Sequence, residues 1–256
     1  MGVTYLAVDV NLDKQVALKV IRSAKVDIKN IDRMFRREAR LAARLQHRNV
    51  ASVFHLGEKE GAYYYAMEYV PGKTVSELIR SRGVLPPLKA MRICAQVARA
   101  LVAAQKHRLV HRDIKPSNIM VAAEEDGEMV VKLIDFGLAK PLLASDDDRS
   151  QFVTATGVDF MGTPAYASPE QCKSEHLDTR SDIYALGCTL WTMLVGSPPF
   201  SGQGLETLIS QIRDDPPWDK LTGIPRVVVN LLHEMLRKEP AKRPPTAEAV
   251  LEKCQA

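Results

Sequence analysis

The densest group of reactive side chains lies in the segment VHRDIKPSNIMV, at residues 110–121. It brings an acid, a cation and an amide close together, as Asp113, Lys115 and Asn118. An aspartate can orient a hydroxyl group and accept its proton, a lysine can neutralise charge on a moving phosphate, and an amide oxygen can bind a divalent cation. These residue types at this spacing favour phosphoryl transfer over an ordinary surface loop held by ion pairs.

A further carboxylate follows the next apolar run, in the segment LIDFGLAK. Asp135 stands where a predicted strand ends, with Phe136 and Gly137 directly after it. Magnesium prefers hard oxygen ligands and keeps room for phosphate oxygens, so Asp135 and Asn118 together can complete a magnesium site. The similar letters DFMG at 159–162 have no apolar strand before them, and we assign them to a loop.

Strands on the N-terminal side must position these groups. Residues 4–10 and 15–21 are β-rich runs on either side of a hairpin turn. Residues 63–70 form a third strand-like run, closed by a Pro-Gly pair. The first 70 residues therefore predict a mainly β unit.

A single helix is predicted within this β-rich part, because apolar residues recur at helical spacing between Ile31 and Leu45. Glu38 falls within the apolar face of that helix, where an unpaired carboxylate would be costly to bury. Glu38 therefore needs a partner, and the nearest candidate by sequence logic is Lys19.

The remainder of the chain is predicted to be mainly helical. Residues 88–107 form a long amphipathic helix, and residues 182–194 are apolar on nearly every face, which is typical of a central buried helix. Between them, residues 118–137 have the pattern of a hairpin. Residues 138–171 lack periodicity, and a loop of this length in a compact domain is usually functional.

Length and composition predict a folded globular protein. The chain has 256 residues, of which 46% are hydrophobic and 26% are charged. Its 35 basic residues exceed its 31 acidic residues by too little to indicate a nucleic-acid partner. We therefore expect no nucleic-acid binding.

The cysteines and the apolar runs bear on location. The chain has no CxxC pair and no histidine at metal-ligand spacing beside its cysteines, so we expect reduced thiols and a cytoplasmic protein. These cysteines are Cys94, Cys172, Cys188 and Cys254. The N-terminus lacks the pattern of a secretory signal, and the most apolar run, residues 183–196, is too short to span a bilayer. We expect no membrane segment in this chain.

Over nearly its whole length the chain resembles the catalytic domain of bacterial eukaryotic-like (Hanks-type) Ser/Thr protein kinases. The catalytic-loop motif is matched by HRDIKPSN and the metal-binding motif by DFG, while VALK at residues 16–19 matches the motif of the strand-three lysine. GTPAYASPEQ, at residues 162–171, resembles the segment that docks a peptide substrate, with Ser168 where alanine is usual. Glu38 then matches the helix-C partner of Lys19.

This resemblance implies an α+β fold of two lobes with ATP and Mg²⁺ (or Mn²⁺) in the cleft between them. The N-lobe, residues 1–70, would be β-rich and would lack its first strand, and the helical C-lobe would span residues 71–256. The implied catalytic residues are Asp113, Lys115, Asn118, Lys19 and Glu38. The implied nucleotide-binding residues are Gly2, Ala17, Lys19, Met67, Glu68, Val70, Met120 and Asp135. The implied metal ligands are Asn118 and Asp135.

The resemblance also implies a substrate class and a mode of regulation. Lys115 and Thr163 fit the pattern of kinases that act on serine and threonine hydroxyls of proteins. Thr154 and Thr156 would be regulatory phosphosites whose phosphate Arg112 could gather, and a homodimer would permit autophosphorylation in trans.

The resemblance implies two further contacts, which would hold residues 162–171 and the catalytic loop in place. Glu170 is expected to pair with Arg243, and Asp182 is expected to anchor the backbone of the catalytic loop. Both would be structural roles.

One departure from the family pattern leaves alternatives open. Of the glycine-rich loop that normally covers the ATP phosphates only Gly2 remains, and Thr4 stands where a valine would cap the adenine. The chain is then either part of a longer active kinase or a catalytically impaired, kinase-like binding or scaffold protein. A small-molecule phosphotransferase is a third class, against which the peptide-docking pattern at residues 162–171 argues.

Overall fold

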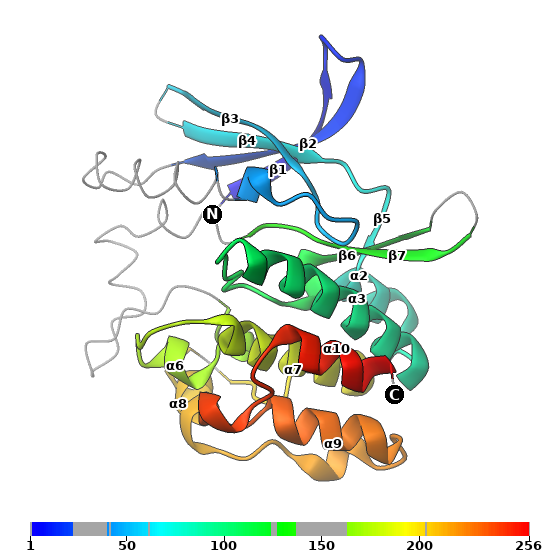
Figure 1. The fold of residues 1–256 in the computed structure, drawn as a ribbon, viewed down its shortest axis with the longest axis vertical. Helices are drawn as coiled ribbons and strands as arrows, with labels where there is room; N and C mark the ends of the chain where they lie inside the picture. Colours follow the sequence, from blue (N-terminus) through cyan, green and yellow to red (C-terminus); the bar gives the residue numbers. More distant parts are fainter. Residues whose placement is uncertain are drawn as a thin grey trace.

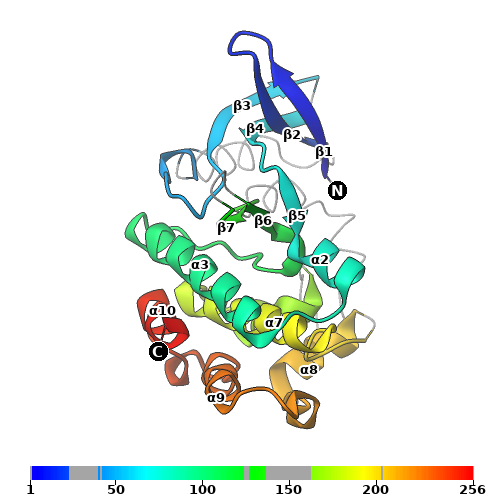
Figure 2. The same cartoon turned by 90° about the vertical axis from the view of Figure 1, so that its right-hand side faces the viewer.

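The computed structural model describes residues 2–22, 40, 42–60, 62–123, 127–136, 163–202 and 204–255. These residues form a β-sheet lobe followed by a larger, mainly helical lobe (Figure 1). In the view turned by 90° the sheet again lies at one end of the molecule and the helices at the other (Figure 2). The two-lobed α+β architecture expected from the sequence is confirmed.

The N-terminal sheet contains strands β1 (Gly2–Asp9), β2 (Lys14–Arg22), β3 (Val53–Lys59) and β4 (Ala62–Glu68). They pair antiparallel in the order β1-β2-β4-β3. The hairpin expected near residue 12 joins β1 to β2, and residues 42–44 are helical, within the helix expected between Ile31 and Leu45. In the register of β2 and β4, Lys19 lies opposite Tyr65.

A second, smaller sheet carries the candidate catalytic segments. It consists of β5 (Gly72–Thr74), β6 (Ile119–Ala123) and β7 (Met129–Leu133), paired in that order. The short 3-10 helix η1 (Pro116–Asn118) leads directly into β6, and Asp135 follows the end of β7. The hairpin therefore brings the two predicted reactive segments to the same end of this sheet.

The helical lobe is built around α7 (Thr179–Val195), whose residues 181–194 are all buried. Pro87–Lys106 forms α3, which packs on α7 and on α10 (Ala247–Gln255). The other helices are α2 (Val75–Arg82), α6 (Pro169–Cys172), α8 (Leu205–Arg213) and α9 (Arg226–Met235). Three further 3-10 helices complete the lobe, η2 (Pro164–Tyr166), η3 (Trp218–Leu221) and η4 (Pro240–Lys242). Because α7 is apolar on nearly every face, it forms the centre of the lobe, as the sequence predicts.

Local signals in the sequence set the ends of these helices. Thr74 caps α2 in a capping box with Glu77, and the Asp178 carboxylate caps α7. The helix α7 stops at Gly196, whose φ of 88° is readily adopted only by glycine. None of the described helices has both the length and the apolar composition required to cross a bilayer.

Candidate active site

The catalytic loop is held from the central helix and from α6. The Asp182 carboxylate accepts hydrogen bonds from the backbone amides of His111 at 2.7 Å and Arg112 at 2.8 Å, as expected. Arg112 has a φ of 65°, a left-handed conformation that costs free energy in a residue other than glycine. The Gln171 side-chain amide donates to the Arg112 carbonyl at 2.9 Å. Two elements therefore stabilise this strained turn directly before Asp113.

Asp113 lies at the centre of a small polar network. Its Oδ2 receives the Lys115 ammonium at 2.9 Å and the Asn118 side-chain amide at 2.9 Å. The same Asn118 nitrogen donates to the Asp113 carbonyl at 2.8 Å, and Lys115 also donates to the Thr163 hydroxyl at 2.9 Å. Because the Asn118 nitrogen is engaged with Asp113, its side-chain oxygen is the atom suited to a cation.

The imidazole of His111 links this loop to the strand that carries Asp135. The Asp113 amide donates to His111 Nδ1 at 3.2 Å, so Nε2 bears the proton and donates to the Ile134 carbonyl at 3.0 Å. The His111 ring also packs on Phe136, with 4.6 Å between ring centroids. The Ile134 amide donates to the Asn118 carbonyl at 3.0 Å. The candidate metal ligands Asn118 and Asp135 are therefore brought to one place.

The Asp135 carboxylate connects the two lobes. Its Oδ2 pairs with the Lys19 ammonium of β2 at 2.5 Å, and its Oδ1 accepts a hydrogen bond from the Tyr65 hydroxyl of β4 at 2.6 Å. Burial raises the pKa of Tyr65 well above its ordinary value, and the charge of Asp135 adds to this, so the phenol remains a donor. Asp135 itself has a φ of 60°, which again places unusual backbone at the site.

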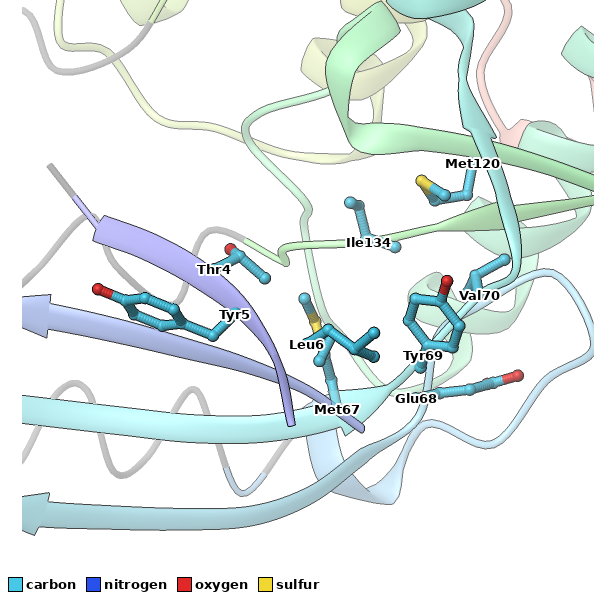
Figure 3. Close-up of a pocket in the computed structure, with 10 residues that line it drawn as sticks. Thr4, Tyr5, Leu6, Met67, Glu68, Tyr69, Val70, Met120 and Ile134 are labelled. Carbon is cyan, nitrogen blue, oxygen red and sulfur yellow. The ribbon is translucent and has the colours of Figure 1, made fainter. Parts of the chain in front are cut away.

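An apolar cavity of about 190 Å³ lies next to this pair, between the two lobes. Figure 3 shows Met120 and Ile134 on one side of it and Leu6 and Met67 on the other. The Glu68 carboxylate points away from the cavity and pairs with Lys132 at 3.0 Å. The full lining consists of Thr4, Tyr5, Leu6, Ala17, Met67, Glu68, Tyr69, Val70, Met120 and Ile134.

Most of the residues expected to bind nucleotide lie at this cavity or beside it. Ala17, Met67, Glu68, Val70 and Met120 line it, whereas Lys19 and Asp135 form the adjacent ion pair. Gly2 is not part of the lining and lies at the start of β1, opposite Ile21. Glu38, Thr154 and Thr156 lie outside the described residues.

Four lining residues, Leu6, Tyr5, Tyr69 and Ile134, were not among the expected ones. Leu6 of β1 pairs with Ala17 of β2. The alternation of side chains along β1 is the sequence signal that would have indicated Leu6.

The sequence matches the family described as the protein kinase domain over residues 1–254. This chain belongs to the protein kinase family.

Named relatives and solved structures agree with that assignment. The kinase is 37% identical over 251 residues to the serine/threonine-protein kinase PrkC of Bacillus subtilis, with 97% of this chain and 37% of that protein covered. It is 36% identical over 254 residues to PknB of Mycobacterium leprae, with 96% and 39% covered. The chain thus spans less than half the length of these curated relatives. The crystal structure of the PknI kinase domain of Mycobacterium tuberculosis superposes with a TM-score of 0.77 at 28% identity, covering 100% of this chain and 90% of that one.

The donor set of this kinase fits the ligands that protein kinases use, which are ATP and a divalent metal. The apolar cavity suits a flat heterocycle, and a lysine and an aspartate beside it suit phosphates and a cation. Among the described residues there is no cluster of three or more His, Cys, Asp or Glu side chains able to hold a metal alone. Two oxygen donors, from Asp135 and Asn118, are what Mg²⁺ requires when substrate phosphates supply further ligands.

The ion pair expected between Glu170 and Arg243 is also present. Both nitrogens of the Arg243 fork contact the Glu170 carboxylate, at 2.7 and 2.8 Å. Ser168, directly before the first residue of α6, caps this helix in a capping box with Gln171. Serine in place of the usual alanine therefore has a local structural role.

Proposed function

We propose that this chain is the catalytic domain of an ATP-dependent protein kinase that phosphorylates serine and threonine residues of proteins. The observation that carries the proposal is the cross-lobe ion pair between Lys19 and Asp135, which lies beside an apolar cavity, together with the Asp113 network. We further propose the lobe boundaries 1–70 and 71–256, with Glu68 to Gly72 as the connection between the lobes.

In this proposal the adenine occupies the cavity lined by Ala17, Met67, Val70 and Met120. The amide of Glu68 already donates to the Ser52 carbonyl at 2.8 Å, so Glu68 contributes its carbonyl to the adenine. Lys19 turns from Asp135 to the phosphates, and Glu38 holds Lys19 there. Gly2 contributes backbone near the phosphates.

The phosphoryl transfer depends on the Asp113 network. Mg²⁺ or Mn²⁺ would be held by Asn118 and Asp135 and would neutralise charge on the ATP phosphates. Asp113 orients the hydroxyl group of the substrate and accepts its proton, and Lys115 offsets the charge that develops on the transferred group. The contact between Lys115 and Thr163 ties this chemistry to the substrate-docking segment.

The similarity to relatives named serine/threonine-protein kinases supports serine and threonine as the acceptor residues in this proposal. We propose that Thr154 and Thr156 are phosphorylated in trans within a homodimer, and that the protein is cytoplasmic. Four free thiols are consistent with a reducing compartment.

The test is incubation with γ-labelled ATP, Mg²⁺ and a generic protein acceptor, beside an Asp113→Asn variant. Asparagine keeps the shape of the side chain but cannot accept the proton. We expect label on protein serine and threonine, and a decrease of about 100-fold or more in the variant, since general-base catalysis contributes about 10²–10⁴-fold. Label on a small molecule alone, or no label from a chain that binds ATP, would overturn the proposal in favour of a small-molecule phosphotransferase or a scaffold protein.

A further inference from the structure

Tyr65 places a hydroxyl group in the core of the N-terminal lobe. The residue is only 1% exposed and its ring is packed within the main hydrophobic cluster, on the same face of β4 as Tyr63 and Met67. A phenylalanine would fill the same space without burying a polar atom. Burying a hydroxyl costs about 1–3 kcal/mol unless it finds a partner, so its partner is informative.

That partner is Asp135, a residue of the other lobe and 70 positions away in sequence. The phenol donates to Oδ1 at 2.6 Å, while Lys19 occupies Oδ2 at 2.5 Å. Under the proposed function Lys19 leaves Asp135 for the nucleotide phosphates. The contact from Tyr65 needs no such release, because a carboxylate oxygen has two lone pairs and can accept a hydrogen bond while it binds a cation.

We propose that Tyr65 is a positioning residue for Asp135, whose hydroxyl orients the carboxylate for the divalent cation that accompanies the nucleotide. The inference rests on the proposed role of Asp135 as a metal ligand. Carboxylates that bind metals are in turn held by hydrogen bonds, and loss of such a contact typically costs about 10–100-fold in metal affinity or activity. The hydroxyl is presented by β4, which pairs with the strand β2 that presents Lys19, so the sheet itself sets the direction of the carboxylate.

The experiment compares Tyr65→Phe with the wild-type chain by direct metal binding. The free Mn²⁺ concentration is measured by electron paramagnetic resonance in the presence of a non-hydrolysable ATP analogue. We expect the Kd for Mn²⁺ to rise about 10-fold, while the affinity for adenosine without metal changes less than about 2-fold. In assays of turnover, raising the Mg²⁺ concentration should restore kcat, because the defect lies in metal binding and not in the reaction step.

Tyr64→Phe is the matched control. It removes a hydroxyl group from the preceding residue of β4, whose ring faces the other side of the sheet, against Gly57 and near His55. Its Mn²⁺ affinity should equal that of the wild-type chain. Unchanged thermal unfolding of both variants would show that the packing is intact.

Three results would overturn the inference. They are an unchanged Mn²⁺ affinity in Tyr65→Phe, a tighter one, which would make the phenol a competitor of the metal, or a wild-type chain that binds no Mn²⁺ with nucleotide. A wild-type chain that binds the metal but labels no protein would overturn only the proposed function.

Discussion

Arg243 is a charged side chain with no exposed surface, and it is nevertheless fully satisfied. Its five N–H groups donate to both oxygens of Glu170 and to the carbonyls of Arg180, Arg237 and Lys238. A buried ion pair is tolerated only when its remaining hydrogen-bonding groups are also paired. The pair therefore fixes α6 to the segment around Arg243, near the C-terminal end of the helical lobe.

Replacing Glu170 should destabilise the fold in a pH-dependent way. Burial raises the pKa of Glu170, but the hydrogen bonds and charge of Arg243 outweigh burial and lower the pKa below its usual 4.5. The stabilisation is therefore complete above 4.5 and is lost as the pH falls through the lowered folded value. We expect Glu170→Gln to reduce the free energy of unfolding by roughly 3–5 kcal/mol at pH 7, because it leaves Arg243 uncompensated.

Urea unfolding at pH 7 and at pH values below 4 would measure this difference. The difference in the free energy of unfolding between the wild-type chain and the variant should decrease at the lower pH, where Glu170 of the wild-type chain becomes protonated. An equal gap at every pH would contradict the ionised pair. Glu239→Gln, in an exposed pair with Lys242, is a control expected to change stability by less than about 1 kcal/mol.

At the scale of elements, α6 and the catalytic loop are joined by one side chain. Gln171 accepts from the Ser168 amide at 3.0 Å through its oxygen and donates to the Arg112 carbonyl at 2.9 Å through its nitrogen. The helix α6 thus contacts the residue directly before Asp113. The conformation of α6 and the geometry of the candidate catalytic loop are therefore physically linked.

Gln171→Glu tests this link, because glutamate can still accept from Ser168 but cannot donate to Arg112. One lost hydrogen bond corresponds to about 0.5–1.5 kcal/mol, so we expect kcat to fall by about 3- to 10-fold with the KM for ATP little changed. Ser168→Ala is the matched control, since it removes the capping hydroxyl and retains the contact with Arg112. Steady-state kinetics in which both variants lose equal activity would assign the effect to the cap of α6 instead.

The elements also show where sequence patterns suffice. The central helix and the β6–β7 hairpin are predicted because their apolar residues follow a clear period, and the motif residues because the chemistry demands their types. Strand β3, with the sequence VFHLGEK, is not singled out, because its polar residues and Gly57 interrupt the alternation. Tyr65 is not predicted either, since its position in an alternating strand is that of a core residue, and only the register of β2 and β4 places it opposite Lys19.

At the scale of the whole molecule, Asn49 fastens the N-terminal lobe to the helical lobe. Its side-chain nitrogen donates to the Val131 carbonyl of β7 and to the Gln96 side chain of α3, both at 2.8 Å. The Ala51 amide also donates to the Leu133 carbonyl, and the Leu133 amide donates to the Asn49 carbonyl. The residue is 3% exposed, so these contacts are not replaced by water if the side chain is removed.

Asn49→Ala should therefore loosen the attachment between the lobes. It removes two hydrogen bonds, to the Val131 carbonyl and to the Gln96 side-chain oxygen, although that oxygen still accepts from the Val131 amide at 2.9 Å. At about 0.5–1.5 kcal/mol for each bond, the expected cost is about 1–3 kcal/mol. We expect a lower unfolding midpoint in urea and faster amide hydrogen exchange in β7. Asn11→Ala, in the exposed turn after β1, should change neither quantity. A variant with unchanged exchange in β7 would show that the backbone bonds alone hold the lobes together.

The ion pair across the cleft influences which ligands can bind there. Lys19 and Asp135 neutralise each other while each keeps only 16% of its side chain in contact with water. An incoming molecule that satisfies just one of them leaves the other as an uncompensated charge in a confined, poorly hydrated space. We therefore expect the cleft to bind a polyanion together with its counter-cation more readily than either one alone.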